Sequence, residues 1–149
     1  MFLIRIMAVM LFVFALPVNA SDRGIGLVIG APTGLTYKQW VSDKQEAIQS
    51  AIGWNTGNNA SLQGSIDYIF HKYNVINVDQ GKLPVYFGIG AQLELGTDFI
   101  VGLRFPLGLD YQFKNEPFDL FLELTPGMQF LPKTAFTLSP ALGVRYFFD

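Results

Sequence analysis

The C-terminal part of the chain alternates strictly between large apolar residues and small or polar ones. In residues 135–148 the apolar series is Phe136, Leu138, Pro140, Leu142, Val144, Tyr146 and Phe148, and the intervening series is Thr137, Ser139, Ala141, Gly143, Arg145 and Phe147. Successive side chains of a β-strand point to opposite faces, so this period of two predicts a strand with one apolar face. Residues 99–113 and 118–130 repeat the pattern. This end of the chain is therefore constrained to two-faced β-structure.

The same alternation dominates the rest of the chain after residue 20, where helical periodicity is scarce. We expect eight strands, and most of the segments between them are short and rich in turn-forming residues. The expected strands are 22–30, 34–41, 47–54, 62–70, 83–95, 99–113, 118–130 and 135–148. Short connections favour antiparallel neighbours, and an even number of strands with both termini on one side suits an up-and-down barrel. Only the connection 71–82 is longer, and we expect it on the side of the termini.

Residues 1–20 have the features of an export signal. Arg5 precedes an apolar run from Ile6 to Leu16, and a short segment ending in Ala20 follows that run. The run is shorter than the roughly 20 apolar residues that a membrane-spanning helix needs. We expect cleavage after Ala20, which leaves residues 21–149 as a single domain.

The composition excludes several kinds of chemistry. The chain has no cysteine, which rules out thiolate metal sites, a cysteine nucleophile, disulfides and a lipoprotein anchor. Without Arg5 of the signal, 9 basic residues face 12 acidic ones, and no basic patch indicates a nucleic-acid partner. Charges interrupt every long apolar run after residue 20. The mature chain can therefore enter a membrane only as a closed barrel, the other structure that satisfies its backbone groups in lipid.

Two arrangements satisfy the alternation. In a transmembrane barrel the apolar face contacts lipid, whereas in a soluble, lipocalin-like barrel it lines a cavity for an apolar ligand. The polar faces are rich in Gly, Ala, Ser and Thr, and charged residues make up 15% of the chain against about 25% in ordinary soluble proteins. Aromatic residues near both ends of the apolar faces suit the two membrane interfaces. The sequence favours the transmembrane barrel, with the soluble periplasmic binder as the alternative.

The candidate site is a structural ionic network inside the barrel, formed by charged residues on the polar faces. These residues are Lys38, Asp67, Glu94, Arg104, Asp110, Asp119, Glu123 and Arg145. Charges removed from water need partners. If the last two strands pair at positions whose numbers add to 266, Arg145 lies diagonal to Glu123 and Asp119. We expect an Arg145–Glu123 pair, with Asp119 or Asp110 as a second carboxylate.

Three prolines, Pro106, Pro126 and Pro140, lie inside expected strands. A closed barrel has no edge at which a missing backbone donor is harmless, so we expect these prolines to mark bulges. The register assumed above places Pro126 opposite Pro140, in a single irregularity.

The end of the chain resembles the assembly signal of bacterial outer-membrane barrels, through Gly143, Tyr146 and Phe148, although Asp149 follows the last aromatic. The whole mature chain also resembles a set of short, functionally uncharacterised outer-membrane barrel proteins, and in architecture the eight-stranded OmpA and OmpX type. The segments that carry this resemblance are 30–35, 67–71, 104–108 and 121–123. The resemblance implies an outer-membrane location, contact with membrane lipid and recognition by the barrel-assembly machinery.

Some small outer-membrane barrels act on lipids, so the resemblance raises a lipid-modifying enzyme as a further alternative. Such chemistry needs a nucleophile beside a base. The only histidine, His71, follows an expected strand, and no serine is nearer in sequence than Ser65, so we interpret His71 as an ordinary surface residue. The sequence shows no cofactor motif or metal cluster, and the side chains of an eight-stranded barrel fill its interior. We therefore expect a structural or unassigned role with no catalytic, cofactor or metal site and no general pore.

Overall fold

The computed structural model describes residues 23–30, 33–42, 44–55, 61–96, 98–131 and 133–148, and its regular elements there are all β-strands. The expected signal sequence, its cleavage site and Asp149 lie outside the described residues. The strands are β1 (Arg23–Gly30), β2 (Gly34–Ser42), β3 (Glu46–Asn55), β4 (Ser61–Lys72), β5 (Val85–Leu95), β6 (Ile100–Arg104), β7 (Leu107–Gln112), β8 (Phe118–Leu131) and β9 (Ala135–Phe148). Within this described part of the chain, no helix is long and apolar enough to cross a membrane.

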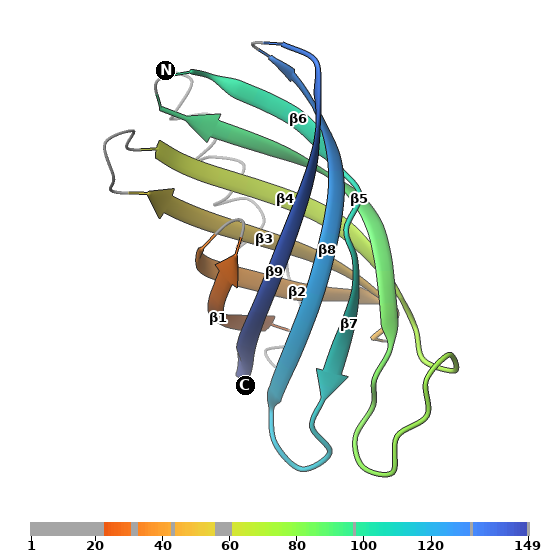
Figure 1. Cartoon of the computed structure of the whole chain (residues 1–149). Coiled ribbons are helices and arrows are strands. Elements are labelled where there is room, and N and C mark those ends of the chain that lie inside the picture. The colour runs from red at the N-terminus through yellow and green to blue at the C-terminus, as the bar shows by residue number, and fades with distance from the viewer. Residues whose placement is uncertain are drawn as a thin grey trace.

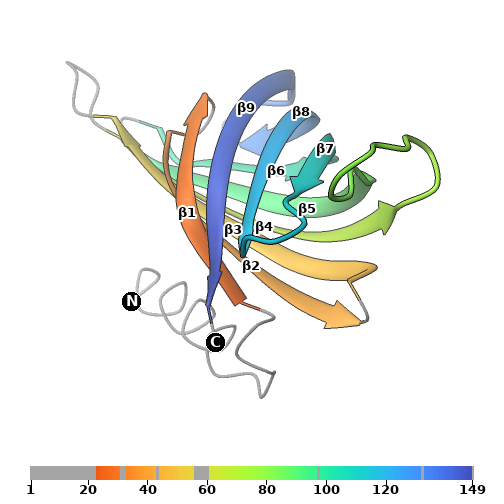
Figure 2. The same ribbon diagram turned by 90° about the horizontal axis from the view of Figure 1, so that it is seen from below.

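The strands form one antiparallel sheet whose hydrogen bonding closes into a ring. Strands β1 to β5 pair in chain order, β6 and β7 each pair with both β5 and β8, and β8 pairs with β9. The ring closes because β9 also pairs with β1, from Arg23 opposite Phe148 to Gly30 opposite Ala141. Figure 2 shows how the strands curve round until β1 lies beside β9. The predictions of an all-β chain and of antiparallel neighbours are confirmed for the described residues.

The sixth expected strand is divided into two, β6 and β7, by Phe105 and Pro106. Both halves pair with β5 on one side and with β8 on the other, so the ring passes through eight strand positions although it contains nine strands. Proline has no N–H to donate. The sheet nevertheless stays hydrogen-bonded between β6 and β7. Gly88 N–H donates to the Pro106 carbonyl at 3.0 Å, and Phe105 N–H donates to the Pro126 carbonyl at 2.8 Å. The expected irregularity at Pro106 is therefore a break in the strand.

The register of β8 with β9 differs from the expected one by two residues. Asp119 lies opposite Arg145 and Leu124 lies opposite Pro140, so paired numbers add to 264. Pro126 lies opposite Leu138, and the pairing continues past both prolines without a shift. The expected pairing of the two prolines in one bulge is wrong. The reason is physical: a two-residue slip keeps every side chain on its own face, so alternation cannot distinguish the two registers.

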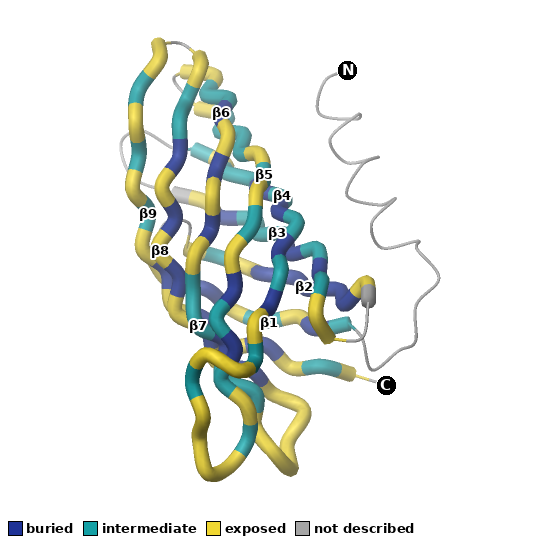
Figure 3. Tube along the Cα trace, turned by 90° about the vertical axis from the view of Figure 1, so that its right-hand side faces the viewer, coloured by how far each residue is buried: buried dark blue, intermediate teal, exposed yellow. Residues whose placement is uncertain are grey.

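Burial alternates along the long strands, as Figure 3 shows, and many of the buried positions hold polar or charged residues. In β8, Leu122 is 57% exposed, whereas its neighbour Glu123 is only 5% exposed. On β9, Leu142, Val144 and Tyr146 are exposed. Arg145, which lies between Val144 and Tyr146 in the sequence, is fully buried. Most large apolar side chains of β8 and β9 thus point out of the ring, whereas Glu123 and Arg145 point in.

One end of the ring, which we call the terminal end, carries both the first residues of β1 and the last residues of β9. The connections β2–β3, β4–β5 and β7–β8 lie at this end, which is the lower one in Figure 1. The long connection, residues 73–84, is among them. This connection starts two residues later than expected, because β4 continues to Lys72.

Candidate functional site

The inside of the ring holds a network of buried charges. Seven of the eight charged residues expected there are almost wholly buried: Lys38, Asp67, Arg104, Asp110, Asp119, Glu123 and Arg145. They come from β2, β4, β6, β7, β8 and β9. Each is buried because it occupies an inward position of its strand. The eighth, Glu94 on β5, is partly exposed and lines a small cavity beside Arg104.

The part of the network nearer the terminal end contains two cations and two carboxylates. Lys38 Nζ lies 2.8 Å from Asp110 Oδ2 and 3.8 Å from Asp119 Oδ2. Arg145 Nε donates to Asp119 Oδ1 at 3.0 Å, and its Nη2 lies 3.9 Å from Asp110 Oδ1. This arrangement is balanced in formal charge, as burial in a medium of low dielectric requires.

His71 belongs to the same cluster. Its Nε2 lies 2.8 Å from Lys38 Nζ and 3.7 Å from Asp110 Oδ2, and its Nδ1 lies 3.2 Å from the Gln45 carbonyl oxygen. The side chain is buried, with its ring centroid 4.5 Å from that of Trp40. Its interpretation as an ordinary surface residue is therefore wrong. The cause is that β4 extends two residues further than expected, which places His71 on the inward face two positions after Ile69.

Aromatic rings complete the surroundings of the two buried cations. Lys38 Nζ stands 4.1 Å from the centroid of the Trp40 ring, and the Arg145 guanidinium carbon stands 4.1 Å from that of Phe121. Cation–π contacts of this kind stabilise a charge that has left water. Phe121 also fills the space above Gly143, where a Cβ would overlap the ring.

A second cluster surrounds Arg104. The Arg104 Nε lies 2.9 Å from Asp67 Oδ1, and this contact is an ion pair whose angle does not suit a hydrogen bond. The Arg104 Nη2 donates a hydrogen bond to Glu123 Oε2 at 2.9 Å. Gly90 lies opposite Asp67 in the sheet, and a Cβ at Gly90 would overlap both Asp67 Oδ1 and the Ile66 carbonyl oxygen. Glycine is thus required at position 90 for the carboxylate to reach Arg104.

Glu123 and Gln49 connect the two clusters. Glu123 accepts hydrogen bonds from Tyr86 at 2.8 Å, from Thr125 at 3.0 Å and from Gln49 at 2.7 Å. The other end of the Gln49 amide, Oε1, accepts from Arg145 Nη1 at 3.3 Å. Gln49 is not among the charged residues expected here, although the sequence offers a signal for it, because it shares a face with Ala47 and Ala51 and alternates with Ile48 and Ile52.

The expected Arg145–Glu123 pair is wrong. Arg145 lies directly opposite Asp119 and binds it, whereas Glu123 binds Arg104. The two-residue difference in register accounts for the exchange of partners. The expectation that Asp119 and Asp110 face Arg145 agrees with the distances given above.

The residues of the expected assembly signal lie on β9. Gly143 points inward beneath Phe121, while Tyr146 and Phe148 are on the outward face. Tyr146 packs edge to face against Phe118 of β8, with the ring centroids 5.2 Å apart. Among the residues that the structure describes, no group of three or more His, Asp or Glu side chains is arranged to hold a metal ion.

A family model matches residues 11–148, a span that includes every member of the buried network. The chain belongs to the DUF3996 family. The description of DUF3996 is that of a protein of unknown function. No curated protein and no solved structure matches this DUF3996 chain.

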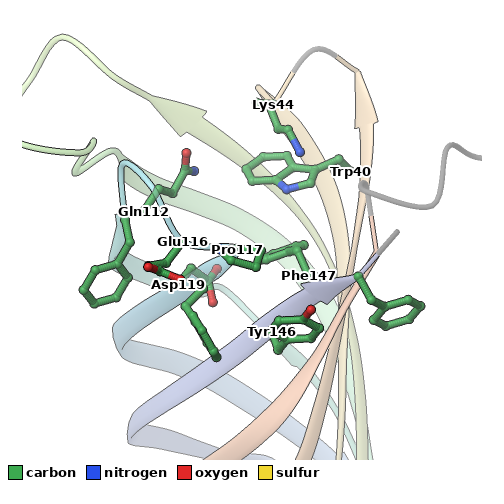
Figure 4. Close-up of a pocket in the computed structure, with 11 residues that line it drawn as sticks. Trp40, Lys44, Gln112, Glu116, Pro117, Asp119, Tyr146 and Phe147 are labelled. Atoms are coloured by element: carbon green, nitrogen blue, oxygen red, sulfur yellow. The ribbon is translucent and has the colours of Figure 1, made fainter.

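Two cavities lie at the two ends of the network in this DUF3996 chain. The larger, of about 430 Å³, is at the terminal end and is lined by residues that include Trp40, Lys44 and Asp119 (Figure 4). The smaller, of about 140 Å³, is lined mainly by polar side chains, including Ser65, Glu94 and Arg104. Buried charges and their hydrogen-bond partners therefore occupy the ring between the two cavities.

Proposed function

We propose that this protein is a small integral outer-membrane β-barrel whose lumen is closed by the ionic network. In this proposal the ring of strands is the barrel, its outward apolar side chains contact lipid, and its role is structural rather than that of a general pore. The residues Gly143, Tyr146 and Phe148 are the signal for the barrel-assembly machinery.

The observation that carries the proposal is the inverted arrangement of polarity. Lys38 and Arg145 are fully buried inside the ring, while Leu107, Leu122 and Leu138 are each more than half exposed on its outside. Fully buried cations and a largely apolar exterior are opposite to what water favours for a folded chain. Lipid removes the contradiction, because in a membrane the apolar exterior is solvated and only the lumen is polar.

The closed lumen argues against a general pore. Gln49 of β3 and Glu123 of β8 bond to each other across the ring and join the cluster of Arg104 to that of Arg145. An eight-position ring has an interior that side chains can fill. Passage of a solute requires that these ion pairs separate, and separated charges in the lumen are strongly unfavourable.

The soluble periplasmic binder of an apolar ligand receives less support. That alternative requires large apolar side chains around an internal cavity, whereas the described inside of the ring holds the charged residues of the network packed against a small apolar cluster. The lipid-modifying enzyme requires His71 beside a serine hydroxyl at the membrane edge. His71 instead contacts Lys38, Asp110 and the Gln45 carbonyl among the described residues.

Fractionation of cells that express the full chain tests the proposed location. We expect the protein in the outer-membrane fraction, resistant to extraction by alkaline carbonate, because its exterior is apolar. We also expect the unheated protein to migrate differently from the boiled one in an SDS gel, since a closed hydrogen-bonded ring resists unfolding by detergent. Recovery in the soluble periplasmic fraction without detergent would reject the proposal and favour the soluble binder.

A further inference from the structure

The cavity at the terminal end has no part in the proposed barrel function. Its volume of about 430 Å³ lies within the range of small-ligand pockets. Its wall combines aromatic rings with charged groups from β2, the β2–β3 turn, the β7–β8 turn and the end of β9. The aromatic residues that line it are Trp40, Phe113, Phe118, Tyr146, Phe147 and Phe148.

The ammonium group of Lys44, a residue that lines this cavity, stands beside two of its aromatic rings. Lys44 Nζ stands 5.3 Å from the centroid of the Trp40 ring and 5.8 Å from that of Phe147. Both distances are within the roughly 6 Å over which a cation is attracted to the face of an aromatic ring. The walls of the cavity are therefore suited to a positive nitrogen.

The backbone at Lys44 is fixed independently of its side chain. Lys44 has a φ of 60°, in the left-handed region, and its carbonyl accepts a hydrogen bond from the Tyr73 hydroxyl. Burial raises the pKa of Tyr73 to about 12, so this hydroxyl keeps its proton at neutral pH. The Lys44 side chain is exposed, and the hydrogen bond from Tyr73 is to the Lys44 backbone, so a change of the side chain leaves that contact of the turn in place.

Carboxylates lie across the cavity from Lys44. Figure 4 shows Lys44 and Trp40 on one side, and Glu116 and Asp119 on the other. Asp119 is 1% exposed, and its Oδ2 is buried without a hydrogen-bond partner among the described residues, at 3.8 Å from Lys38 Nζ. Glu116 is exposed at the mouth. An aromatic wall facing carboxylates is the chemistry that recognises organic ammonium ions.

We propose that this cavity is a binding site for an organic ammonium group, primary or quaternary, and that Lys44 is an internal occupant that the ligand displaces. Trp40 and Phe147 contact the ammonium group, while the exposed Glu116, which lines the cavity, supplies the compensating negative charge. The same chemistry is presented by a free amine such as choline and by the headgroup of a zwitterionic lipid. The proposal does not depend on membrane insertion, because every residue that it uses lies in the described part of this one chain.

Titration with choline chloride tests the site, with sodium chloride at the same ionic strength as the control. The protein carries Trp54→Phe, so that Trp40 is its only tryptophan, and is kept in a maltoside detergent, which has no ammonium group. We expect a saturable change in Trp40 emission with choline and none with sodium. Lys44→Ala should lower the choline concentration at half of this change at least threefold, because it removes the internal competitor. Glu116→Gln should raise this midpoint concentration at least threefold.

The matched control is Lys114→Ala, a change to an exposed lysine of the neighbouring turn that does not line the cavity. Its midpoint should equal that of the parent protein. A response that is the same with sodium, or a midpoint that Lys44→Ala leaves unchanged or raises, would overturn the proposal. Because Lys44 and Glu116 are exposed, neither change threatens folding, and calorimetric titration of the same variants provides a second readout.

A lipid arm distinguishes the two sources of the ammonium group. In nanodiscs of phosphatidylglycerol, which lacks an ammonium group, choline should still titrate Trp40. In nanodiscs of phosphatidylcholine, the Trp40 emission can already be shifted before choline is added, relative to that in phosphatidylglycerol. Such a shift, together with loss of the choline response, identifies the lipid headgroup as the occupant. An unchanged choline response identifies a free amine instead.

Discussion

Replacing Arg145 by Met should destabilise the folded protein by about 3–5 kcal/mol, which is the cost of leaving a buried partner charge unpaired. Arg145 is fully buried, and its loss leaves Asp119 without its 3.0 Å partner and removes one of the two cationic side chains, Lys38 and Arg145, that lie near Asp110. The three cations Lys38, Arg104 and Arg145 already face four carboxylates, so the substitution changes the formal charge of the network from −1 to −2. Urea unfolding of the refolded protein, followed by tryptophan emission, measures the loss.

A double-mutant cycle identifies the partner. Asp119→Asn in the Arg145→Met background restores the formal charge of the parent network. The double variant should therefore lose much less free energy of unfolding than the two single variants lose in sum. The same cycle with Glu123→Gln should show weaker coupling, because Glu123 binds Arg104. Lys133→Met, at an exposed turn, is the control and should change stability by less than about 0.5 kcal/mol. Equal coupling of Arg145 to Asp119 and to Glu123 would refute the observed register.

The second large effect is expected on the outside of the ring. Leu122→Arg places a charge near the middle of an outward strand face and should cost about 2–4 kcal/mol in a bilayer. Leu122→Met keeps the site apolar and should cost less than about 1.5 kcal/mol. Thr137→Arg faces the smaller polar cavity beside Ser139, so the arginine there can remain solvated and the loss should be smaller. Refolding yield and urea stability in lipid vesicles give the comparison, and a larger loss for Thr137→Arg than for Leu122→Arg would mean that the faces are inverted.

Alternation was sufficient to predict most of the strands and their two faces. The expected strand 62–70 is Ser61–Lys72 in the structure, and the expected 83–95 is Val85–Leu95. The reason is that burial of one face in a paired sheet enforces a period of two at every position. Which of the two faces lies inside follows from the small size of the residues between the large apolar ones.

The sequence could not predict which buried charges are partners. Pairing depends on register, and registers that differ by two residues present the same faces, so Arg145 was assigned to Glu123 rather than to Asp119. His71 was missed for a different reason, because a strand end is set by pairing with the next strand rather than by local preference. The break at Pro106 was expected as a bulge, but the bonds that seal it depend on Gly88 of another strand.

The most direct test of the central claim is the accessibility of single nitroxide labels on the outward face. The natural chain has no cysteine, so Leu107→Cys, Leu122→Cys and Leu142→Cys each provide one labelling site, with Lys133→Cys at an exposed turn as the reference. In protein reconstituted into lipid vesicles, we predict that the three outward labels collide readily with dissolved oxygen and poorly with a water-soluble nickel chelate. The reference label should show the reverse. Outward labels that collide with the nickel chelate as readily as the label at position 133 would contradict a membrane-spanning barrel.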